Sequence, residues 1–407
     1  MVSVKLNFAL APRPFDSANL NGFPMPSVLI LIAAVCALLG AAGTVYFALT
    51  IRAALQFQRE VSPQADAAFT PPVSILKSLK GVDPHMYAAF RSHCLLDYPE
   101  YELLFGFHDL DEPALALVEK LRAEFPERHI RLVHCRQVLG LNGKVSALVQ
   151  MLPQAQYEHI VISDSDILVE WDYLLRVLAP MASPQVGMVT TLYRALSGKT
   201  WASRLEALGI STDFAGGVLV ARALEGGIRF GLGATIATTK TALSEIGGLE
   251  PLADYLGDDY ELGARVAATG HQVALADAVV ETALPDYSFR DFWMHQLRWA
   301  RNVKDRRPAQ YLGLIVTFGL PWAILAVMFW LSWWSCLVLA AAVIARFASA
   351  IFVGRGVLDD DHVGSDLWLL PLRDFVALAI WIASFMGNTV VWRGLRFKVR
   401  NGKLEKA

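Results

Sequence analysis

Residues 159–166 read HIVISDSD, a short apolar run that ends on two aspartates separated by one residue. The run 159–163 has the length and composition of a buried strand, so Asp164 and Asp166 follow directly from its carboxyl end. In open α/β sheets, ligands bind in the crevice beyond the carboxyl ends of the strands. This stretch therefore predicts a sheet with a polar site at its edge.

The sequence on either side of this stretch alternates between strand-like and helix-like runs over residues 70–305. Such alternation is typical of an α/β domain with a mainly parallel sheet. The region is long enough for one well-buried domain. We expect strands and helices in it at the following positions: strands at 73–79, 101–108, 130–135, 159–163 and 186–192, and helices at 113–125 and 144–152.

The rest of the chain is more apolar than this domain. The 407 residues are 55% hydrophobic, and the mean hydropathy of +0.40 is high for a soluble enzyme. The run 27–51 is long enough to cross a bilayer. A signal peptide is the alternative, but its apolar core would be shorter and would lie nearer to Met1. We expect a transmembrane anchor at 27–51, preceded by a leader at 1–26.

A second apolar region covers residues 311–392. Its first part, 312–353, is too long for one span and fits a hairpin of two. Its last part, 367–392, contains Arg373 and Asp374, and charged groups inside an apolar segment are costly in lipid. We expect these two side chains to pair or to face protein or the membrane interface, and this segment to be irregular.

Residues 393–407 form a tail rich in arginine and lysine. The positive-inside rule predicts that this tail is cytosolic. A cytosolic domain at 70–305 shares that side only if 311–392 contains two full spans and one re-entrant or interfacial segment. We therefore expect a multi-pass membrane protein with a cytosolic catalytic domain, in the inner membrane if the source is bacterial.

Charge and cysteine content argue against several classes of function. The formal net charge is −2, so no overall positive field favours nucleic acid as a partner. The four cysteines are scattered and none forms a CxxC pair. A zinc site or a disulfide framework is therefore not expected.

Asp164 and Asp166 have the spacing of a metal-binding pair. Residues i and i+2 of an extended segment point to the same side, so both carboxylates can approach one divalent cation. Mg²⁺ or Mn²⁺ prefers oxygen ligands and often shares them with substrate phosphates. A nucleotide-sugar donor needs such a cation because its diphosphate gains charge as the sugar leaves. A second acidic cluster, DLDE at 109–112, follows the predicted strand 101–108; the alternative for either cluster is a solvated turn.

The segment GDDYEL at 257–262 opens a run with helical spacing over 258–268. One aspartate at a helix N-terminus is explained as a cap that stabilises the helix dipole. The second adjacent carboxylate is available as a general base toward an acceptor hydroxyl. The residues alone leave open which of Asp258 and Asp259 has which role.

The segment 289–304 is amphipathic, aromatic and followed by further basic residues. This pattern predicts an interfacial helix, with basic groups on lipid phosphates and tryptophans at headgroup level. That role does not prevent Arg298 and Trp299 from also meeting the diphosphate of a donor.

These three sites, in this order, resemble the D1, D2, D3 and (Q/R)xxRW signature of processive and lipid-directed family 2-like glycosyltransferases. The resemblance is strongest to the ceramide glucosyltransferase family, glycosyltransferase family 21; bacterial hopanoid-associated N-acetylglucosaminyltransferases share the motifs. It covers nearly all of 70–305 and implies a GT-A type nucleotide-sugar-binding domain. It rests on SILKSLKGVDP, LLDYPEYE, HDLDEPA, GLNGKVSAL, ISDSD, IGGL, GDDYELG and RWARN.

Position by position, the resemblance implies a role for each candidate residue: Asp109 and Asp111 at the uracil and ribose of UDP, Lys144 at the donor, Asp164 and Asp166 at the metal and diphosphate, Asp259 as catalytic base, and Arg298 and Trp299 as the RW pair. Two positions depart from the family pattern. His295 stands where glutamine or arginine is usual, with Gln296 shifted by one, so its role is open. Asp166 is kept where ceramide glucosyltransferases often lack the second aspartate, which favours direct metal coordination.

The implied reaction is inverting transfer of a sugar from a UDP-sugar to a lipid hydroxyl at the cytosolic membrane face. Ceramide and hopanoid acceptors remain alternatives, as do glucose and N-acetylglucosamine donors. A processive polysaccharide synthase would need more spans to thread a polymer. A non-enzymatic scaffold with a degenerate domain would lack some of the carboxylates, and all of them are present.

Overall fold

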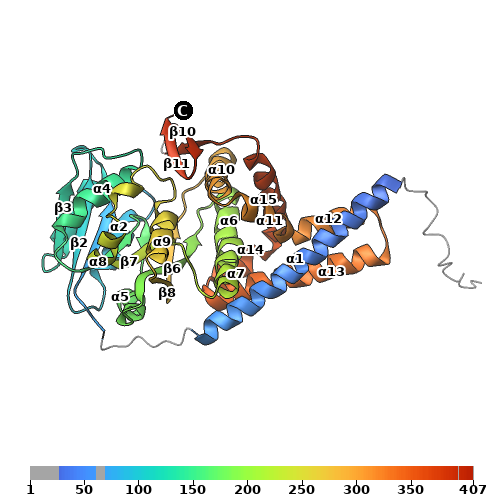
Figure 1. The fold of residues 1–407 in the computed structure, drawn as a ribbon, viewed down its shortest axis with the longest axis horizontal. Coiled ribbons are helices and arrows are strands. Elements are labelled where there is room, and N and C mark those ends of the chain that lie inside the picture. The colour runs from blue at the N-terminus through green and yellow to red at the C-terminus, as the bar shows by residue number, and fades with distance from the viewer. Residues whose placement is uncertain (1–26, 61–68, 393, 407) are drawn as a thin grey trace, which may run out of the picture.

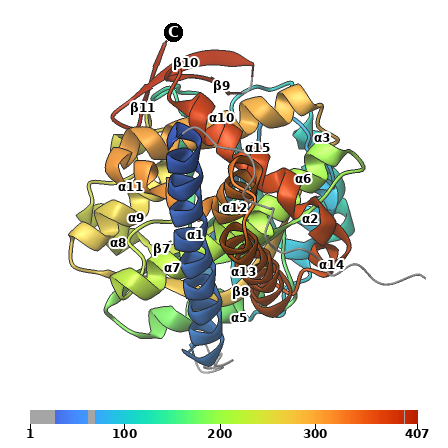
Figure 2. The same cartoon turned by 90° about the vertical axis from the view of Figure 1, so that its right-hand side faces the viewer.

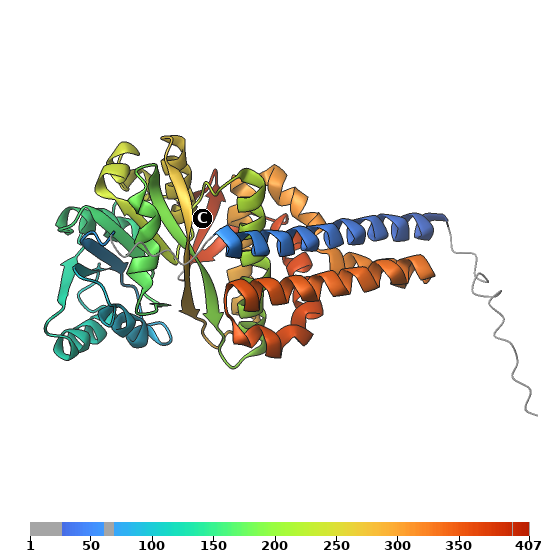
Figure 3. The same cartoon turned by 90° about the horizontal axis from the view of Figure 1, so that it is seen from below.

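The computed structural model describes residues 27–60, 69–392 and 394–406. Its elements lie in three tiers: a sheet domain, a middle layer of helices, and long helices that project away from both (Figure 1, Figure 3). The predicted leader, 1–26, lies outside the described residues.

The sheet domain contains an eight-stranded sheet with the order β3-β2-β1-β4-β7-β6-β8-β5. Neighbours β3, β2, β1 and β4 are parallel, as are β6 and β8, whereas β7 is antiparallel to both of its neighbours and β5 is antiparallel to β8. The mainly parallel α/β fold is therefore confirmed. The strands are β1 (Val73–Ser78), β2 (Tyr101–Phe107), β3 (His129–His134), β4 (His159–Ser163), β5 (Ile167–Leu168), β6 (Val186–Leu196), β7 (Thr235–Thr239) and β8 (Gln272–Ala283).

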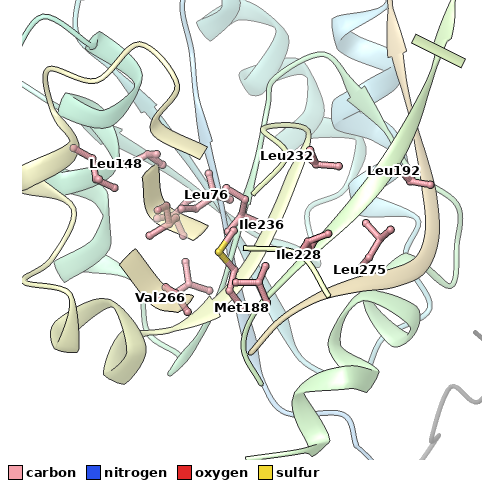
Figure 4. Close-up of a cluster of buried hydrophobic side chains, with 14 of the residues drawn as sticks. Leu76, Leu148, Met188, Leu192, Ile228, Leu232, Ile236, Val266 and Leu275 are labelled. Carbon is pink, nitrogen blue, oxygen red and sulfur yellow. The ribbon is translucent and has the colours of Figure 1, made fainter. Parts of the chain in front are cut away.

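All five predicted strands are present, and β5, β7 and β8 are additions. The central strands β1, β2 and β4 are buried on both faces, as continuous apolar runs in parallel sheets usually are. Alternate side chains enter two hydrophobic cores, so Leu76 and Ile75 of β1 lie on opposite faces. Figure 4 shows part of the core that contains Leu76, where Leu148 and Val266 also pack.

Helices on each face of the sheet complete these cores. The core around Leu76 receives side chains from α4 (Gly143–Met151), α8 (Lys240–Glu245) and α9 (Asp258–Ala268). The core around Ile75 receives side chains from α2 (Met86–Cys94), α3 (Ala114–Glu124) and α5 (Tyr173–Leu178). The predicted helices at 113–125 and 144–152 correspond to α3 and α4.

The middle layer is a set of helices between the sheet and the projecting helices (Figure 3). A nearly continuous run, α6 (Trp201–Gly209), a π-helical turn at Ile210–Phe214 and α7 (Ala215–Glu225), was not anticipated from the sequence. It is apolar enough to be a candidate span, but 56% of its most apolar stretch is buried inside the protein. The layer is completed by α10 (Phe289–Arg306), α14 (Asp361–Asp366) and α15 (Leu370–Ser384).

The projecting helices are α1 (Ser27–Glu60), α12 (Gly319–Phe329) and α13 (Trp333–Ala350), which pack against one another (Figure 2). Among the described residues, four helices are long and apolar enough to cross a membrane. A fifth is obtained if Pro308–Thr317, which contains α11 (Pro308–Gly313), and α12 form one span with a bend of 56° between them. The helices α12 and α13 form a hairpin that turns at residues 330–332, within the predicted hairpin 312–353.

The first helix is longer than the predicted anchor, because its last turns pack on protein. Ala54 and Phe57 are buried in the core that α7 and Val353 also line. Only the earlier part of α1 projects from the molecule (Figure 3).

The segment 367–392, expected to be re-entrant or interfacial, contains the helix α15. Arg373 and Asp374 are buried in protein, as one of the expected alternatives required, but they do not pair with each other. Asp374 accepts hydrogen bonds from Arg346 of α13 at 2.8–3.1 Å, and Arg373 lies 3.3 Å from Asp213 of the π-helical turn. The α15 helix tolerates the charges because protein, and not lipid, surrounds them.

The basic tail is folded. Residues of β9 (Thr389–Trp392), β10 (Leu395–Arg400) and β11 (Lys403–Lys406) form a three-stranded antiparallel sheet. Its buried side chains pack against Leu256, and Leu404 N–H donates to the carbonyl of Asp254. Buried and exposed residues alternate in β10, which is typical of a strand. The many arginines and lysines hid this alternation in the sequence.

At Gly43 of α1 and Gly319 of α12, the backbones of two projecting helices lie in close contact. A Cβ at Gly43 would lie 2.2 Å from Gly319 Cα. We expect Gly43→Val to force α1 away from α12 and to destabilise the folded protein by about 1–3 kcal/mol, the usual cost of overpacking. Thermal unfolding in detergent should show a lower Tm than in the control Ala41→Val, which changes an exposed neighbour. Equal Tm values for the two variants would contradict this packing.

Candidate active site

Acidic residues from two distant segments meet at the carboxyl end of β4. Asp164 and Asp166 follow β4, and Asp258 and Asp259 open α9. Gly233, in the loop before β7, lies between the two groups. A Cβ there would be 3.6 Å from Asp164 Oδ2 and 3.1 Å from Asp259 Oδ2. Glycine therefore keeps open the space that the two carboxylates face.

Lys144 holds the two acidic segments together. It lies in the first turn of α4, where the Asn142 side chain caps the helix by accepting from Val145 N–H at 3.2 Å. Lys144 Nζ is 2.6 Å from Asp164 Oδ1 and 3.8 Å from Asp258 Oδ2. Burial acts to lower the pKa of Lys144, but the two carboxylates outweigh it and raise that pKa, so the ammonium stays charged.

The neighbours Asp258 and Asp259 have different surroundings. Asp258 accepts from Asn142 Nδ2 at 3.1 Å and faces Lys144, so it is engaged in holding α4 to α9. The helix α9 has no side-chain cap hydrogen bond, since Gly257 precedes it. Burial, together with the charge of Asp258, raises the pKa of Asp259 to about 6. This difference favours Asp259 as the carboxylate that exchanges a proton.

The carboxylates of Asp164 and Asp166 fit a divalent cation that is shared with a substrate. Asp166 Oδ2 accepts from Thr282 Oγ1 at 2.5 Å, while burial and the nearby charge of Asp164 raise the pKa of Asp166. No cluster of three or more metal-ligating side chains occurs within residues 27–60, 69–392 and 394–406. Mg²⁺ is usually held by one or two carboxylates plus substrate phosphates, and this oxygen pair suits that arrangement.

Lys77 is a site residue that sequence reasoning missed. It lies near the carboxyl end of β1 with no exposed surface, and its Nζ donates to Ser163 Oγ at 2.9 Å and to the Asp164 carbonyl at 2.8 Å. Burial lowers the pKa of Lys77 to about 7, against the opposing effect of the nearby aspartates. Lys77 thus ties the turn after β4 to β1. A lysine inside the apolar run VSILKS was the available signal.

Asp109 and Asp111 lie after β2, and both are exposed. Asp109 Oδ2 is 2.8 Å from Lys80 Nζ, and this ammonium lowers the pKa of Asp109. The buried acid of this cluster is Glu112, which accepts from Gly81 N–H at 2.7 Å and so joins the loops after β1 and β2. The structure puts both aspartates at the carboxyl end of the parallel strands without bringing them into the cluster around Lys144.

The predicted RW pair lies on α10. The guanidinium of Arg298 lies over the ring of Trp392 of the C-terminal sheet, at 5.9 Å from its centroid. Trp299 is exposed, and its Nε1 donates to His295 Nε2 at 3.3 Å. The other nitrogen of His295 is 2.8 Å from the carboxylate of Glu206 on α6, a buried residue that sequence reasoning did not single out.

Comparison with known families decides the class of this protein. The model of glycosyl transferase family 21 matches residues 34–405, nearly the whole chain. The chain belongs to glycosyltransferase family 21. It is therefore a glycosyltransferase, and the resemblance drawn from its motifs is confirmed.

Relatives and solved structures agree with this assignment. Ceramide glucosyltransferase 1 of Caenorhabditis elegans is 25% identical over 355 residues, covering 82% of this chain and 72% of the relative. A ceramide glucosyltransferase of Komagataella phaffii is 28% identical over 113 residues, covering 27% of this chain and 21% of the relative. The mannosyltransferase PcManGT of Pyrobaculum calidifontis, solved with GDP-Man and Mn²⁺, is 18% identical, covers 88% of this chain and 98% of its own, and has a TM-score of 0.53. The family 21 transferase thus has the predicted GT-A type fold.

The surroundings of the two aspartates predict different outcomes for their asparagine variants. If Asp259 is the general base, Asp259→Asn should lower kcat by roughly two to four orders of magnitude, the usual contribution of such a group. Donor affinity and Tm should change little. Asp258→Asn, which weakens the contact to Lys144, should instead lower Tm and donor affinity. Steady-state kinetics and thermal unfolding of both variants test this assignment, and an active Asp259→Asn enzyme would contradict it.

The raised pKa of Asp259 also predicts the pH dependence of the rate. A general base must be ionised, so kcat should be constant above about pH 6 and fall about tenfold per unit as the pH drops through that value. An ordinary aspartate would lose activity only near pH 4. The residual rate of Asp259→Asn should lack this acid limb. A wild-type profile that stays flat down to about pH 4.5 would rule out a base with this pKa.

Proposed function

We propose that this family 21 enzyme transfers a sugar from a UDP-sugar to a lipid hydroxyl, with inversion, at the cytosolic membrane face. The observation that carries the proposal is the cluster of carboxylates around Lys144, which includes an aspartate with a raised pKa and stands next to a layer of helices continuous with the projecting ones. Lipid acceptors reach such a site from the bilayer, whereas the donor arrives from water.

The donor side of the proposal rests on Asp164, Asp166 and Lys144. The two carboxylates would hold Mg²⁺ or Mn²⁺, which supplies positive charge against the departing diphosphate. Lys77 and Lys144 fix the turn that carries these carboxylates. PcManGT was solved with Mn²⁺ and a nucleotide sugar, which supports metal use here.

The outer parts of the donor would be bound by residues away from this cluster. Asp109 and Asp111 stand at the carboxyl ends of the parallel strands, the side on which such sheets bind nucleotides, and would take the uracil and ribose. Arg298 and Trp299 of α10 would line the diphosphate on the opposite side.

The acceptor side of the proposal rests on Asp259. Its carboxylate takes the proton of the acceptor hydroxyl while the hydroxyl oxygen bonds to the anomeric carbon and the bond to UDP breaks. One displacement inverts the anomeric centre, so an α-linked donor gives a β-glycoside. Partial burial suits Asp259 to this step, because a base works best when its pKa lies near the working pH.

The membrane side of the proposal rests on three groups of elements. The helices α1, α12 and α13 would span the bilayer, and the aromatic helix α10 would lie at its surface. The C-terminal sheet packs on the catalytic domain and exposes Arg396, Lys398 and Arg400. Basic residues on this side of the spans favour a cytosolic orientation.

The acceptor and the sugar are proposed from the relatives' names. Ceramide glucosyltransferases of a nematode and a yeast favour ceramide and glucose. Hopanoid and N-acetylglucosamine form the alternative pair. Purified protein in lipid nanodiscs, given UDP-glucose or UDP-N-acetylglucosamine with ceramide or bacteriohopanetetrol, should yield one β-linked glycolipid, identified by mass spectrometry and proton NMR. Release of free sugar or polymer without a glycolipid would contradict the proposal.

The metal is tested separately from the acceptor. Asp164→Ala should abolish glycolipid formation and metal-dependent UDP binding, measured by titration calorimetry, while the protein remains folded and membrane-inserted. EDTA should inhibit the wild type, and added Mn²⁺ or Mg²⁺ should restore it. The matched control Asp277→Ala removes a surface carboxylate that pairs with Arg176 and should remain active. Full turnover by both the chelated wild type and Asp164→Ala would end the metal hypothesis.

A further inference from the structure

Glu206 is a buried carboxylate that the proposed chemistry does not use. It lies on α6 with its side chain 2% exposed, and its Oε1 is 2.8 Å from His295 Nδ1. Its Oε2 is buried and has no hydrogen-bond partner in the described part of the chain. A carboxylate oxygen taken out of water without a partner is costly, so this atom needs one.

His295 presents a second buried atom that lacks a partner. Its Nε2 accepts from Trp299 Nε1–H at 3.3 Å, so a neutral imidazole carries its hydrogen on Nδ1. Nδ1 lies close to Glu206 but is not aligned for a hydrogen bond, and within the described ranges it has no hydrogen-bond partner. An unused acceptor and an unused donor therefore lie side by side.

Two tyrosines connect this pair to the site of sugar transfer. Burial and four nearby carboxylates raise the pKa of Tyr193, namely those of Asp259, Glu206, Asp164 and Asp166. Tyr287, whose ring stacks on His295 with centroids 5.8 Å apart, lies in the field of both Glu206 and Asp166. Tyr193 therefore lies close both to Glu206 and to the carboxylates of the candidate site. The middle helix layer that carries Glu206 faces the projecting helices (Figure 3).

We propose that Glu206 and His295 form a subsite for a second hydroxyl of the lipid acceptor, next to the one that receives the sugar. A hydroxyl donates one hydrogen bond and accepts others, so it can donate to Glu206 Oε2 and accept from His295 Nδ1–H at the same time. The inference rests on the proposed function, because it assigns part of the acceptor to this site. The subsite would make the enzyme selective for headgroups with neighbouring polar groups over simple alcohols.

A third buried group without hydrogen-bond partners packs against α6, about one turn after Glu206. The guanidinium of Arg373 packs on Gly209, three residues after Glu206, and a Cβ there would lie 2.4 Å from its Nε. Nε and Nη1 of Arg373 are buried without hydrogen-bond partners in the described residues. Residues three apart share a helix face. A headgroup that continues along α6 would therefore meet donors suited to hydroxyl or carbonyl oxygens.

Two acceptor lipids of equal length separate this subsite from a merely structural pair. Hexadecanol offers one hydroxyl, and the vicinal diol of hexadecane offers two. We expect the wild type to glycosylate the diol with a higher kcat/KM. Glu206→Gln replaces the charged acceptor with a neutral amide and should lower kcat/KM for the diol by about 10-fold, with little change for hexadecanol or for the KM of the donor.

Control variants keep the outcome decisive. Glu245→Gln breaks another glutamate–histidine pair, with His271 at 2.7 Å on the surface, and should leave the preference for the diol unchanged. His295→Gln keeps a donor but removes the ring, and should also reduce the preference. If Glu206→Gln does not fold, as judged by Tm, the proposal is tested by His295→Gln, through the ratio of its kcat/KM values for the diol and for hexadecanol.

The possible failures are distinguishable. An active wild type without preference for the diol, or an unchanged preference in Glu206→Gln and His295→Gln, would overturn the subsite while leaving the proposed function intact. A wild type that glycosylates neither these lipids nor ceramide or bacteriohopanetetrol would overturn both proposals.

Discussion

The contact between Lys144 and Asp164 is the interaction on which the arrangement of the site depends. Asp164 and Asp259, from two distant segments, converge near Gly233, with Asp166 and Asp258 beside them in the chain. Like charges in a partly buried space repel strongly. Lys144 supplies the central positive charge, at 2.6 Å from Asp164 and 3.8 Å from Asp258. It thereby offsets the repulsion between the turn after β4 and the start of α9.

Further contacts hold this ion pair in place from both sides. Asn142 caps α4 and also binds Asp258, so the helix that carries Lys144 is fixed to α9. Lys77 reaches from β1 to the carbonyl of Asp164 and fixes the turn after β4. Asp259 is left without a comparable anchor, and its neighbours raise its pKa. The framework that restrains the carboxylates of Asp164 and Asp258 thus leaves Asp259 with a raised pKa, in agreement with the proton transfer proposed for it.

A second set of charges joins this domain to the projecting helices. Arg346 of α13 pairs with Asp374 of α15 and with Asp213 of the π-helical turn, and Arg373 also contacts Asp213. Two arginines and two aspartates balance in charge, which buried ion clusters require. Because Asp213 lies in the same helical run as Glu206, the base of the hairpin and the proposed acceptor subsite share one rigid support.

The sequence by itself determined the elements whose signal is local. Strands β1, β2 and β4 are continuous apolar runs, and the aspartates after β4 and at α9 could be assigned to a site because strand ends and helix starts are local features. The strands β5 and β8 were not found, since β5 has two residues and β8 is rich in alanine and as compatible with a helix. The strand β7 was missed although its threonines favour a strand. The tail was identified by charge, and its strand alternation was overlooked.

Only the tertiary structure decided how the site is assembled. It showed that Asp258 and not Asp259 is held by Asn142 and Lys144, that Lys77 lies beneath Asp164, and that Glu206 meets His295 from another helix. Each of these contacts joins residues that are tens of residues or more apart in the chain. Such contacts depend on how helices and strands pack, and a side chain's burial, partner and pKa follow from that packing rather than from its sequence neighbours.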